Sequence, residues 1–428
     1  MSASVWRKCR LRDIAYIYRG GNFQKNDFTP EGKPCIHYGQ MYTHFGTFTD
    51  KVLTYLPEDI FKKSRIAVSN DVIMAITSET VEDVCSCVAW IGKEDIAISG
   101  HTAIIHHQQD AKFLSYYFHS DSFFTQKSRV AHGSKVIEMN PSDLEKTTII
   151  FPKDPEEQQR IASILSTCDT VIQKTQKTID KYKAIKQGMM QDLFTRGLTK
   201  DGKLRPSFKD APELYKESEL GMIPKEWEVK ELGECSNKPE YGLNTPAVDY
   251  DGHIGYLRIT DIDDDSHRFI KDGITSPLEY SEEYKLFDND LVFARTGASV
   301  GKTYLYSKED GNLYFAGFLI KFRILDNYSS KFIYYHTLFP RYKNWVVCYS
   351  MRTGQPGVNA EEFATFKLPI PSKTEQTAIA ARLSSMDTTI QKEEAILEKY
   401  KNIKTGLMAH LLTPPADATI IDETGETL

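Results

Sequence analysis

A near-copy of one 39-residue segment constrains this chain more than any other feature of its sequence. Residues 157–195 and 375–413 align without a gap, 218 positions apart, and 20 of the 39 aligned positions are identical. This separation is close to half of the 428 residues. An internal repeat on this scale predicts a duplicated architecture. We therefore expect two tandem halves, each a divergent globular part followed by a copied segment.

Weaker matches extend the duplication into the globular parts. They relate Trp6 to Trp227, and residues 70–75, 112–114 and 139–152 to residues 289–294, 331–333 and 358–371. Runs rich in β-branched and aromatic residues predict strands at 72–76, 96–98, 103–106, 291–294, 314–324 and 367–370. Helices are expected at 112–127 and 331–347. The expected fold class is α+β, with two similar mixed α/β domains in tandem.

The copied segments have the pattern of long helices with a heptad seam. Each helix should be about 55 Å long, at 1.5 Å per residue. Polar residues interrupt both seams at equivalent positions, Thr175 with Glu393 and Lys186 with Lys404, and such interruptions fix register. We expect the two helices to pair as an antiparallel coiled coil with pseudo-twofold symmetry. The proposed seam comprises Ile161, Leu165, Ile172, Ile179, Tyr182, Leu193, Ile379, Leu383, Ile390, Leu397, Tyr400 and Leu411.

Prolines and composition shifts set the expected boundaries. These are a first domain (1–151), its helix (152–195), a linker (196–226), a second domain (227–370), its helix (371–413) and a frayed acidic tail (414–428). Basic residues dominate 174–209. This run fits a solvated helix face or a surface that meets nucleic-acid phosphates, and the sequence leaves both open.

Charge and hydropathy exclude several classes of protein. The net charge of −6 argues against a surface that grips nucleic acid everywhere, although it allows local basic patches. No apolar run is long enough to span a membrane, and the N-terminus lacks the apolar core of a secretory signal. Seven scattered cysteines suit a reducing compartment. We expect a cytoplasmic protein without a membrane partner.

The motifs of catalysis are missing from the sequence. The Gly-rich run 297–303 resembles a phosphate-binding loop but has three residues between its glycines instead of four. Cys85 and Cys87 lack a second cysteine pair, and neither His101 nor His106 has a second ligand at helical spacing. No Asn/Asp-Pro-Pro-aromatic motif of an adenine methyltransferase is present. These absences favour a recognition protein with no catalytic residues and no metal.

The arrangement resembles the specificity subunit of type I restriction-modification systems. The resemblance covers essentially the whole chain. It is carried by Gly-Met-Ile-Pro-Lys-Glu-Trp at 221–227, Phe-Ala-Arg-Thr-Gly at 293–297, Ile370-Pro371 before Glu375-Gln376, and the Lys-Gly-Met-type helix ends at 185–190 and 403–408. The first domain departs from the pattern at 76–78, where Ile-Thr-Ser replaces Arg-Thr-Gly.

This resemblance implies two target recognition domains, each reading half of a split, asymmetric double-stranded DNA sequence. The paired helices would set the spacing between the halves and dock two modification subunits. Those subunits would use S-adenosylmethionine to methylate adenine, and restriction subunits would use ATP and Mg²⁺ to cleave foreign DNA. The chain itself would bind no cofactor.

Base readout needs side chains with paired donors or acceptors on loops. The candidate DNA-binding residues are His37, Tyr38, Gln40, His101, Ser134 and Lys135 in the first domain, and Arg258, Thr260, Asp261, Arg295, Lys302, Arg352 and Gln355 in the second. An alternative hypothesis is a coiled-coil scaffold that joins protein partners without touching DNA. A fragment of a fused methyltransferase is disfavoured by the missing motif.

Overall fold

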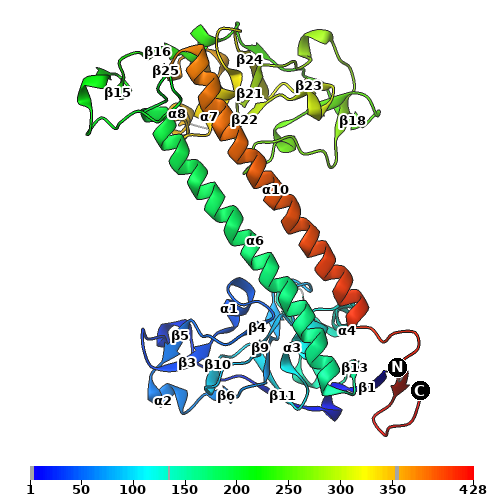
Figure 1. The fold of residues 1–428 in the computed structure, drawn as a ribbon. Coiled ribbons are helices and arrows are strands. Elements are labelled where there is room, and N and C mark those ends of the chain that lie inside the picture. Colours follow the sequence, from blue (N-terminus) through cyan, green and yellow to red (C-terminus); the bar gives the residue numbers. More distant parts are fainter. Residues whose placement is uncertain (1–3, 134, 352–355) are drawn as a thin grey trace. The chain divides into compact units, whose positions relative to one another are not determined.

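The computed structural model describes residues 4–133, 135–351 and 356–428. Its contacts divide the chain into two compact units. The first unit contains residues 1–177 and 394–428, and the second contains residues 178–393. Each unit therefore combines one globular module with a segment of each of two long helices (Figure 1).

The first unit contains a mixed α/β module. Its strands are β1 (Val5–Arg10), β2 (Ala15–Arg19), β3 (Lys33–Ile36), β4 (Phe48–Thr49), β5 (Thr54–Leu56), β6 (Arg65–Ala67), β7 (Val72–Ala75), β8 (Thr77–Ser78), β9 (Cys87–Trp90), β10 (Ile96–Ile98), β11 (Thr102–His107), β12 (Ile137–Glu138), β13 (Thr148–Pro152) and β26 (Thr419–Ile421). Its short helices are α1 (Tyr38–Thr43), α2 (Glu58–Phe61), α3 (Ala111–Phe118), α4 (Asp121–Val130) and α5 (Pro141–Leu144). The main sheet has the order β2-β11-β7-β9-β4, and a second sheet has the order β5-β3-β10-β6.

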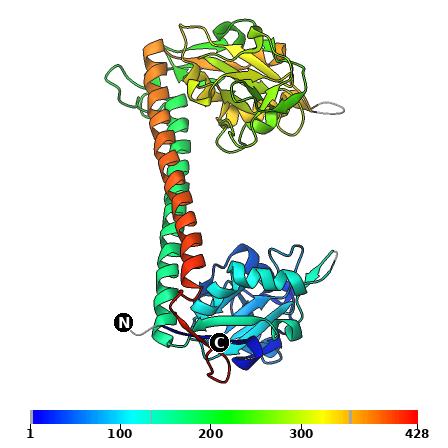
Figure 2. The same ribbon diagram turned by 90° about the vertical axis from the view of Figure 1, so that its right-hand side faces the viewer.

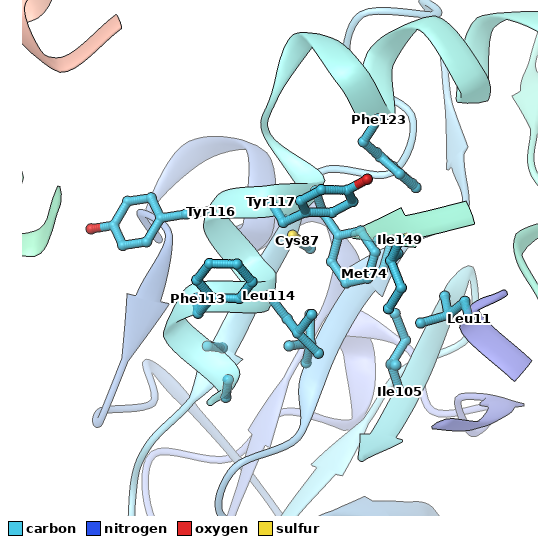
Figure 3. Packing of buried hydrophobic residues seen from close by; sticks show 14 of the residues in the cluster. Leu11, Met74, Cys87, Ile105, Phe113, Leu114, Tyr116, Tyr117, Phe123 and Ile149 are labelled. Atoms are coloured by element: carbon cyan, nitrogen blue, oxygen red, sulfur yellow. The ribbon is translucent and has the colours of Figure 1, made fainter. Parts of the chain in front are cut away.

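Strand β7 shows why these sequences form a central strand. All four of its residues are buried, because alternate side chains enter hydrophobic clusters on opposite faces of the sheet. Met74 faces the cluster that includes α3, and Ile73 faces the other cluster. Figure 3 shows Leu114 and Tyr117 of α3 gathered near Met74 and Ile105. A sheet covered on both faces explains the continuous apolar run in the sequence.

The second unit contains a module built on the same plan. Its strands are β14 (Tyr215–Ser218), β15 (Gly221–Pro224), β16 (Glu228–Glu231), β17 (Glu240–Tyr241), β18 (Ala247–Asp249), β19 (Gly255–Leu257), β20 (Thr275–Pro277), β21 (Asp290–Ala294), β22 (Thr303–Leu305), β23 (Leu313–Phe315), β24 (Leu319–Arg323) and β25 (Lys367–Ile370). Its short helices are α7 (Ser330–Thr337), α8 (Pro340–Ser350) and α9 (Ala360–Ala364). Strand β21 pairs antiparallel with β24, as β7 pairs with β11 in the first unit. The predicted fold class, two similar mixed α/β domains each followed by a long helix, is confirmed.

Three elements that were predicted as continuous are each divided in two in the structure. The single strand expected at 314–324 is two strands, because β23 pairs parallel with β19 while β24 pairs antiparallel with β21. The helix expected at 112–127 is split into α3 and α4, where the Ser120 side chain accepts a hydrogen bond from Phe123 N and caps α4. The helix expected at 331–347 is split into α7 and α8, and Pro340 begins α8.

The predicted long helices are confirmed as α6 (Pro155–Thr195) and α10 (Lys373–Leu411). Among the proposed seam residues, Ile172, Tyr182, Tyr400 and Leu411 are partly buried and the others are buried. Both ends of the seam also enter the module cores. Ile161 and Leu165 share a cluster with Leu412 in the first unit, and Leu193 shares one with Ile379 in the second. Residues from opposite ends of the helices therefore meet, so the helices run antiparallel within each unit.

A Lys–Asp–Tyr triad joins the two helices to the module in each unit. In the first unit Lys404 Nζ lies 2.6 Å from Asp169 Oδ1, and the Tyr116 hydroxyl donates to Asp169 Oδ2 at 2.6 Å. Positions related by the repeat form the second triad. Lys186 Nζ lies 2.6 Å from Asp387 Oδ1, and the Tyr335 hydroxyl donates to Asp387 Oδ2 at 2.7 Å. Each lysine comes from one long helix and each aspartate from the other, which fixes their register.

The acidic tail is not frayed, which corrects the expectation from its composition. Residues Thr419–Ile421 form β26, which pairs parallel with Val5–Arg7 of β1. Ile421 is buried, and the Arg7 guanidinium donates to the carbonyl of Glu423 at 3.2 Å. The tail thus adds a strand to the three-stranded sheet β13-β1-β26 (Figure 2).

The segment 196–226 carries ordered structure in the second unit, where β14 and β15 form a hairpin. Arg205 is almost fully buried, and its guanidinium forms hydrogen-bonded ion pairs with Glu375 and Glu226. The Trp227 indole N–H donates to both carboxylate oxygens of Glu375 at 3.3 Å. Gly197 has φ +63°, and a Cβ there would lie 2.3 Å from the Trp227 ring, so only glycine fits. We call this group the Arg205 clasp.

No helix within the described ranges is both long and apolar enough to cross a lipid bilayer.

Candidate nucleic-acid interface

In the second module, Arg258 and Asp261 are bound to each other. Strand β19 leads into a 3₁₀ turn at Ile259–Asp261, and the Arg258 backbone N donates to Asp261 Oδ2 at 2.8 Å to cap it. The Arg258 guanidinium donates to both Asp261 oxygens, at 2.9 and 2.8 Å. These hydrogen bonds raise the pKa of Arg258 above its usual value. Asp261 therefore holds the half-exposed guanidinium in one orientation, and Thr260 lies exposed between the two.

Arg295 has a different environment, because aromatic rings surround its guanidinium. It lies 5.3 Å from the Tyr241 ring centroid and 5.7 Å from that of Phe318, and its Nε donates to the Gly317 carbonyl at 3.1 Å. Tyr241 is 45% exposed and Phe318 is 59% exposed. Large aromatic side chains with this exposure are suited to stacking on bases, and a guanidinium between them is suited to paired acceptors. We call these three residues the Arg295 sandwich.

Lys302 lies on the Gly-rich run but is engaged within the module. Its ammonium group forms an ion pair with Asp264 and donates to the Ile262 carbonyl at 2.9 Å. Its side chain is only 10% exposed. Lys302 therefore links the Gly-rich run to the loop that carries Ile262 and Asp264.

Four of the first-module candidates, His37, Tyr38, Gln40 and His101, lie at the end of β3 and the start of β11. The rings of His37 and Tyr38 have centroids 4.5 Å apart, and those of Tyr38 and His101 are 5.2 Å apart. His37 is buried, and burial, reinforced by Lys25 and His101, lowers its pKa. Its Nδ1 accepts from Gly39 N at 3.2 Å, so the ring caps α1.

Gln40 also supports this turn rather than extending from it. Its Oε1 accepts from His37 N at 3.0 Å, and its Nε2 donates to Thr54 Oγ1 at 3.2 Å. His101 is exposed, whereas Tyr38 and Gln40 are partly buried. Lys135 is exposed, whereas Ser134, Arg352 and Gln355 lie outside the described residues.

Strand registers show that the two modules place these groups at equivalent positions. Strand β11 begins at Thr102, which pairs with Ala75, and β24 begins at Leu319, which pairs with Ala294. The residues just before these two strands, His101 and Phe318, are therefore equivalent.

The neighbouring strands extend the equivalence. Ala103 pairs with Arg19, and Ile320 pairs with Tyr241, so Arg19 and Tyr241 are also equivalent. We call the resulting surface the recognition rim. In the first module it consists of the turn after β3 with Arg19 and His101, and in the second module it consists of the turn after β19 with Tyr241 and Phe318.

Sequence reasoning missed three rim residues, namely Arg19, Tyr241 and Phe318. Arg19 forms a 2.5 Å ion pair with Glu138 and donates to Asn140 Oδ1 at 3.3 Å. Phe318 was hidden because residues 314–324 were interpreted as one strand. Gly317 was the available signal, since glycine is one of the residues that dominate turns.

The described residues do not gather three or more His, Cys, Asp or Glu side chains in an arrangement that could hold a metal ion. The rim contains guanidinium, hydroxyl, imidazole and aromatic groups, which are the groups that contact bases and phosphates. Such groups can form hydrogen bonds and stack on bases.

The chain belongs to the family described as the type I restriction modification DNA specificity domain. The family model matches twice, at residues 4–183 and 224–402, once in each half. The match confirms the resemblance found in the sequence and favours DNA specificity over a protein-only scaffold.

Named relatives of similar length agree with this membership. The type I restriction enzyme MjaVIII specificity subunit of Methanocaldococcus jannaschii is 25% identical over 381 residues, which cover 83% of this chain and 81% of the relative. The EcoKI specificity subunit of Escherichia coli K12 is 21% identical, with 94% and 88% covered. The crystal structure of the type I S subunit from M. genitalium shares the fold with a TM-score of 0.60 and 16% identity, covering 97% of this chain and 98% of that one.

Proposed function

We propose that this chain is the DNA-recognition subunit of a type I restriction-modification complex and that each module reads one half of a bipartite, asymmetric target. The observation that carries the proposal is the duplicated recognition rim. Two copies of one fold place different side chains at matching positions, His101 where the second module has Phe318 and Arg19 where it has Tyr241. Two divergent readers on one scaffold suit a target whose halves differ in sequence.

The chain contributes recognition and leaves chemistry to its partners. We propose that two modification subunits bind it and methylate adenine with S-adenosylmethionine, and that restriction subunits supply ATP- and Mg²⁺-dependent cleavage of unmodified, foreign DNA. These partners would also supply much of the phosphate neutralisation, since the chain itself has a net charge of −6. The site of action is the cytoplasm.

The candidate residues would serve DNA recognition in different ways, some by contacting DNA and others by supporting the loops that do. We propose that Arg295, Tyr38 and His101 contact bases directly and that Thr260 and Lys135 contact the edges or phosphates. The others, His37, Gln40, Arg258, Asp261 and Lys302, would hold the reading loops in shape, because each makes hydrogen bonds within its module. Ser134, Arg352 and Gln355, which lie outside the described residues, remain proposed contacts.

Mapping methylated adenines after expression of the chain with its modification subunit tests this function. The expected result is methylation at one split sequence with a fixed spacer. Replacing residues 1–150 by the corresponding module of a relative should change one half of that sequence and leave the other half intact. Methylation at an unsplit site, or changes in both halves, would contradict the proposal.

A further inference from the structure

The Arg205 clasp closes the junction between module and helix in the second unit. Burial alone would lower the pKa of Arg205, yet its hydrogen bonds with Glu375 and Glu226 raise that pKa above its usual value. Leu198 N also donates to Glu375 Oε1, at 2.7 Å. The clasp therefore uses a main-chain N–H, an indole N–H and a guanidinium to saturate one carboxylate at the start of α10.

The first unit has the same junction without the clasp. Glu157 is the repeat equivalent of Glu375, Trp6 is equivalent to Trp227, and Val5 therefore stands in the position of Glu226. Instead of binding the glutamate, the Trp6 indole N–H donates to Ser4 Oγ at 3.2 Å.

A pocket of about 700 Å³ lies at this junction in the first unit. It is lined by Ser4, Val5, Lys153, Asp154, Glu156, Glu157 and Arg160. Two of the lining positions, Val5 and Glu157, are those whose equivalents hold Arg205 in the second unit. The pocket is thus the counterpart of a site that the second unit fills with an arginine.

Among the described residues, no cation occupies on Glu157 the buried place that Arg205 has on Glu375. The tail that follows α10 lies along β1, and residues 414–428 contain neither arginine nor lysine. Arg160, which also lines the pocket, lies 3.9 Å from the Glu157 carboxylate, and its side chain is 74% exposed. Such an exposed pair is weak compared with the buried, multiply hydrogen-bonded pair in the clasp.

We propose that this pocket is a docking site for an arginine side chain of a partner protein, seated on Glu157 as Arg205 is seated on Glu375. The partner belongs to the complex that the proposed function requires, so the inference rests on that function. A guanidinium matches a carboxylate through two parallel hydrogen bonds, which an ammonium group cannot reproduce. The module that lacks an internal arginine is therefore the one that receives an external one.

A peptide copying residues 196–206, which carries Arg205, is the first probe. It should bind the full-length chain at one site, as measured by calorimetry, and Glu157→Gln in the chain should weaken binding at least about tenfold. The peptide with Arg205→Lys should bind more weakly than the native peptide. Asp121→Asn, which removes an exposed carboxylate from the first turn of α4, is the matched control and should leave binding unchanged.

The complex with the modification subunit is the second probe. Glu157→Gln should weaken assembly at least about tenfold, whereas Asp121→Asn should not. Equal binding of the native peptide, a scrambled peptide and the Glu157→Gln chain would overturn the docking site, as would unchanged assembly of the Glu157→Gln complex. Loss of bipartite methylation with peptide binding intact would instead overturn the proposed function alone.

Discussion

Arg295 differs from the other cationic candidates of the second module in what surrounds it. Arg258 and Lys302 are each neutralised by a carboxylate of their own module. Within the described residues, the contacts of Arg295 are a carbonyl group and two exposed rings. A guanidinium that is oriented by rings keeps its charge available for an outside acceptor.

Arg295→Ala should reduce affinity for the cognate duplex about tenfold to a hundredfold, because a good base contact contributes about 1–3 kcal/mol. The change should relax only the half-site that the second module reads. Fluorescence anisotropy of the reconstituted complex on matched and mismatched duplexes measures both effects. Arg382→Ala, on the exposed face of α10, serves as the control. An equal loss for both variants would contradict the assignment.

His336 is a second residue with a distinct consequence. It is buried, its ring stacks on Phe194 with centroids 3.8 Å apart, and neither ring nitrogen has a hydrogen-bond partner among the described residues. Burial, reinforced by Arg341, lowers the pKa of His336 well below its usual value. His336 therefore takes up a proton in the unfolded chain but stays neutral in the folded chain, so the protein loses stability as the pH falls below about 6.5.

His336→Leu should remove that loss. For one such histidine, the free energy of unfolding should be up to about 2 kcal/mol lower at pH 5 than at pH 7, because it falls by about 1.36 kcal/mol per pH unit below the unfolded-state pKa. Urea unfolding of both proteins at several pH values measures it. Parallel pH profiles for the two proteins would refute a buried neutral imidazole.

Local sequence shows some residue roles and hides others. Arg258 and Asp261 carry opposite charges three residues apart, a spacing that brings side chains together in a helical turn, so their mutual binding could have been predicted. The Arg295 sandwich could not, because Tyr241 reaches Arg295 only through the pairing of β17 with β24. Contacts set by strand pairing over long sequence distances leave no local pattern.

At the scale of elements, the two long helices were the most predictable part of the fold, because a heptad pattern is local and repeats many times. The lysines that interrupt the seam also predicted register control. Their partners did not follow from the pattern, since Asp169 and Asp387 pair with lysines on the opposite helix. The tail strand β26 was missed for the same reason, because it pairs with β1 at the other end of the chain.

A double-mutant cycle on the second triad tests its contribution to stability. Lys186→Met and Asp387→Asn should show a coupling energy of about 1–2 kcal/mol, because the side chains are only 15% and 25% exposed. The same cycle on Lys401 and Glu398, whose side chains are 51% and 64% exposed, should give less than about 0.5 kcal/mol. Equal coupling in the two cycles would show that burial does not strengthen the triad.

At the scale of the whole molecule, charge distribution decides how the protein meets DNA. The chain carries net charge −6. Several members of its basic run, including Lys186 and Arg205, form ion pairs within the protein, which favours a structural role for them over phosphate contact. Under the proposed function, sequence-specific contacts from the rims would act together with phosphate contacts from the partner subunits.

The salt dependence of DNA binding should show whether the partner subunits provide most of the phosphate contacts. The complex with modification subunits should lose affinity steeply between 50 and 200 mM salt, about 10³-fold or more if it makes six or more phosphate contacts, whereas the isolated chain should bind the same duplex weakly. Titrations of both species at several salt concentrations provide the measurement. Tight binding by the isolated chain with a flat salt profile would contradict this view.

The make-up of the first unit has a consequence for biosynthesis. Its core includes Leu412 and its sheet includes β26, and both follow the whole second module in the sequence. The first module is therefore completed only after the second module has been synthesised, when its edge strand and its helix partner become available. A product terminated within the second module would carry an unfinished first module.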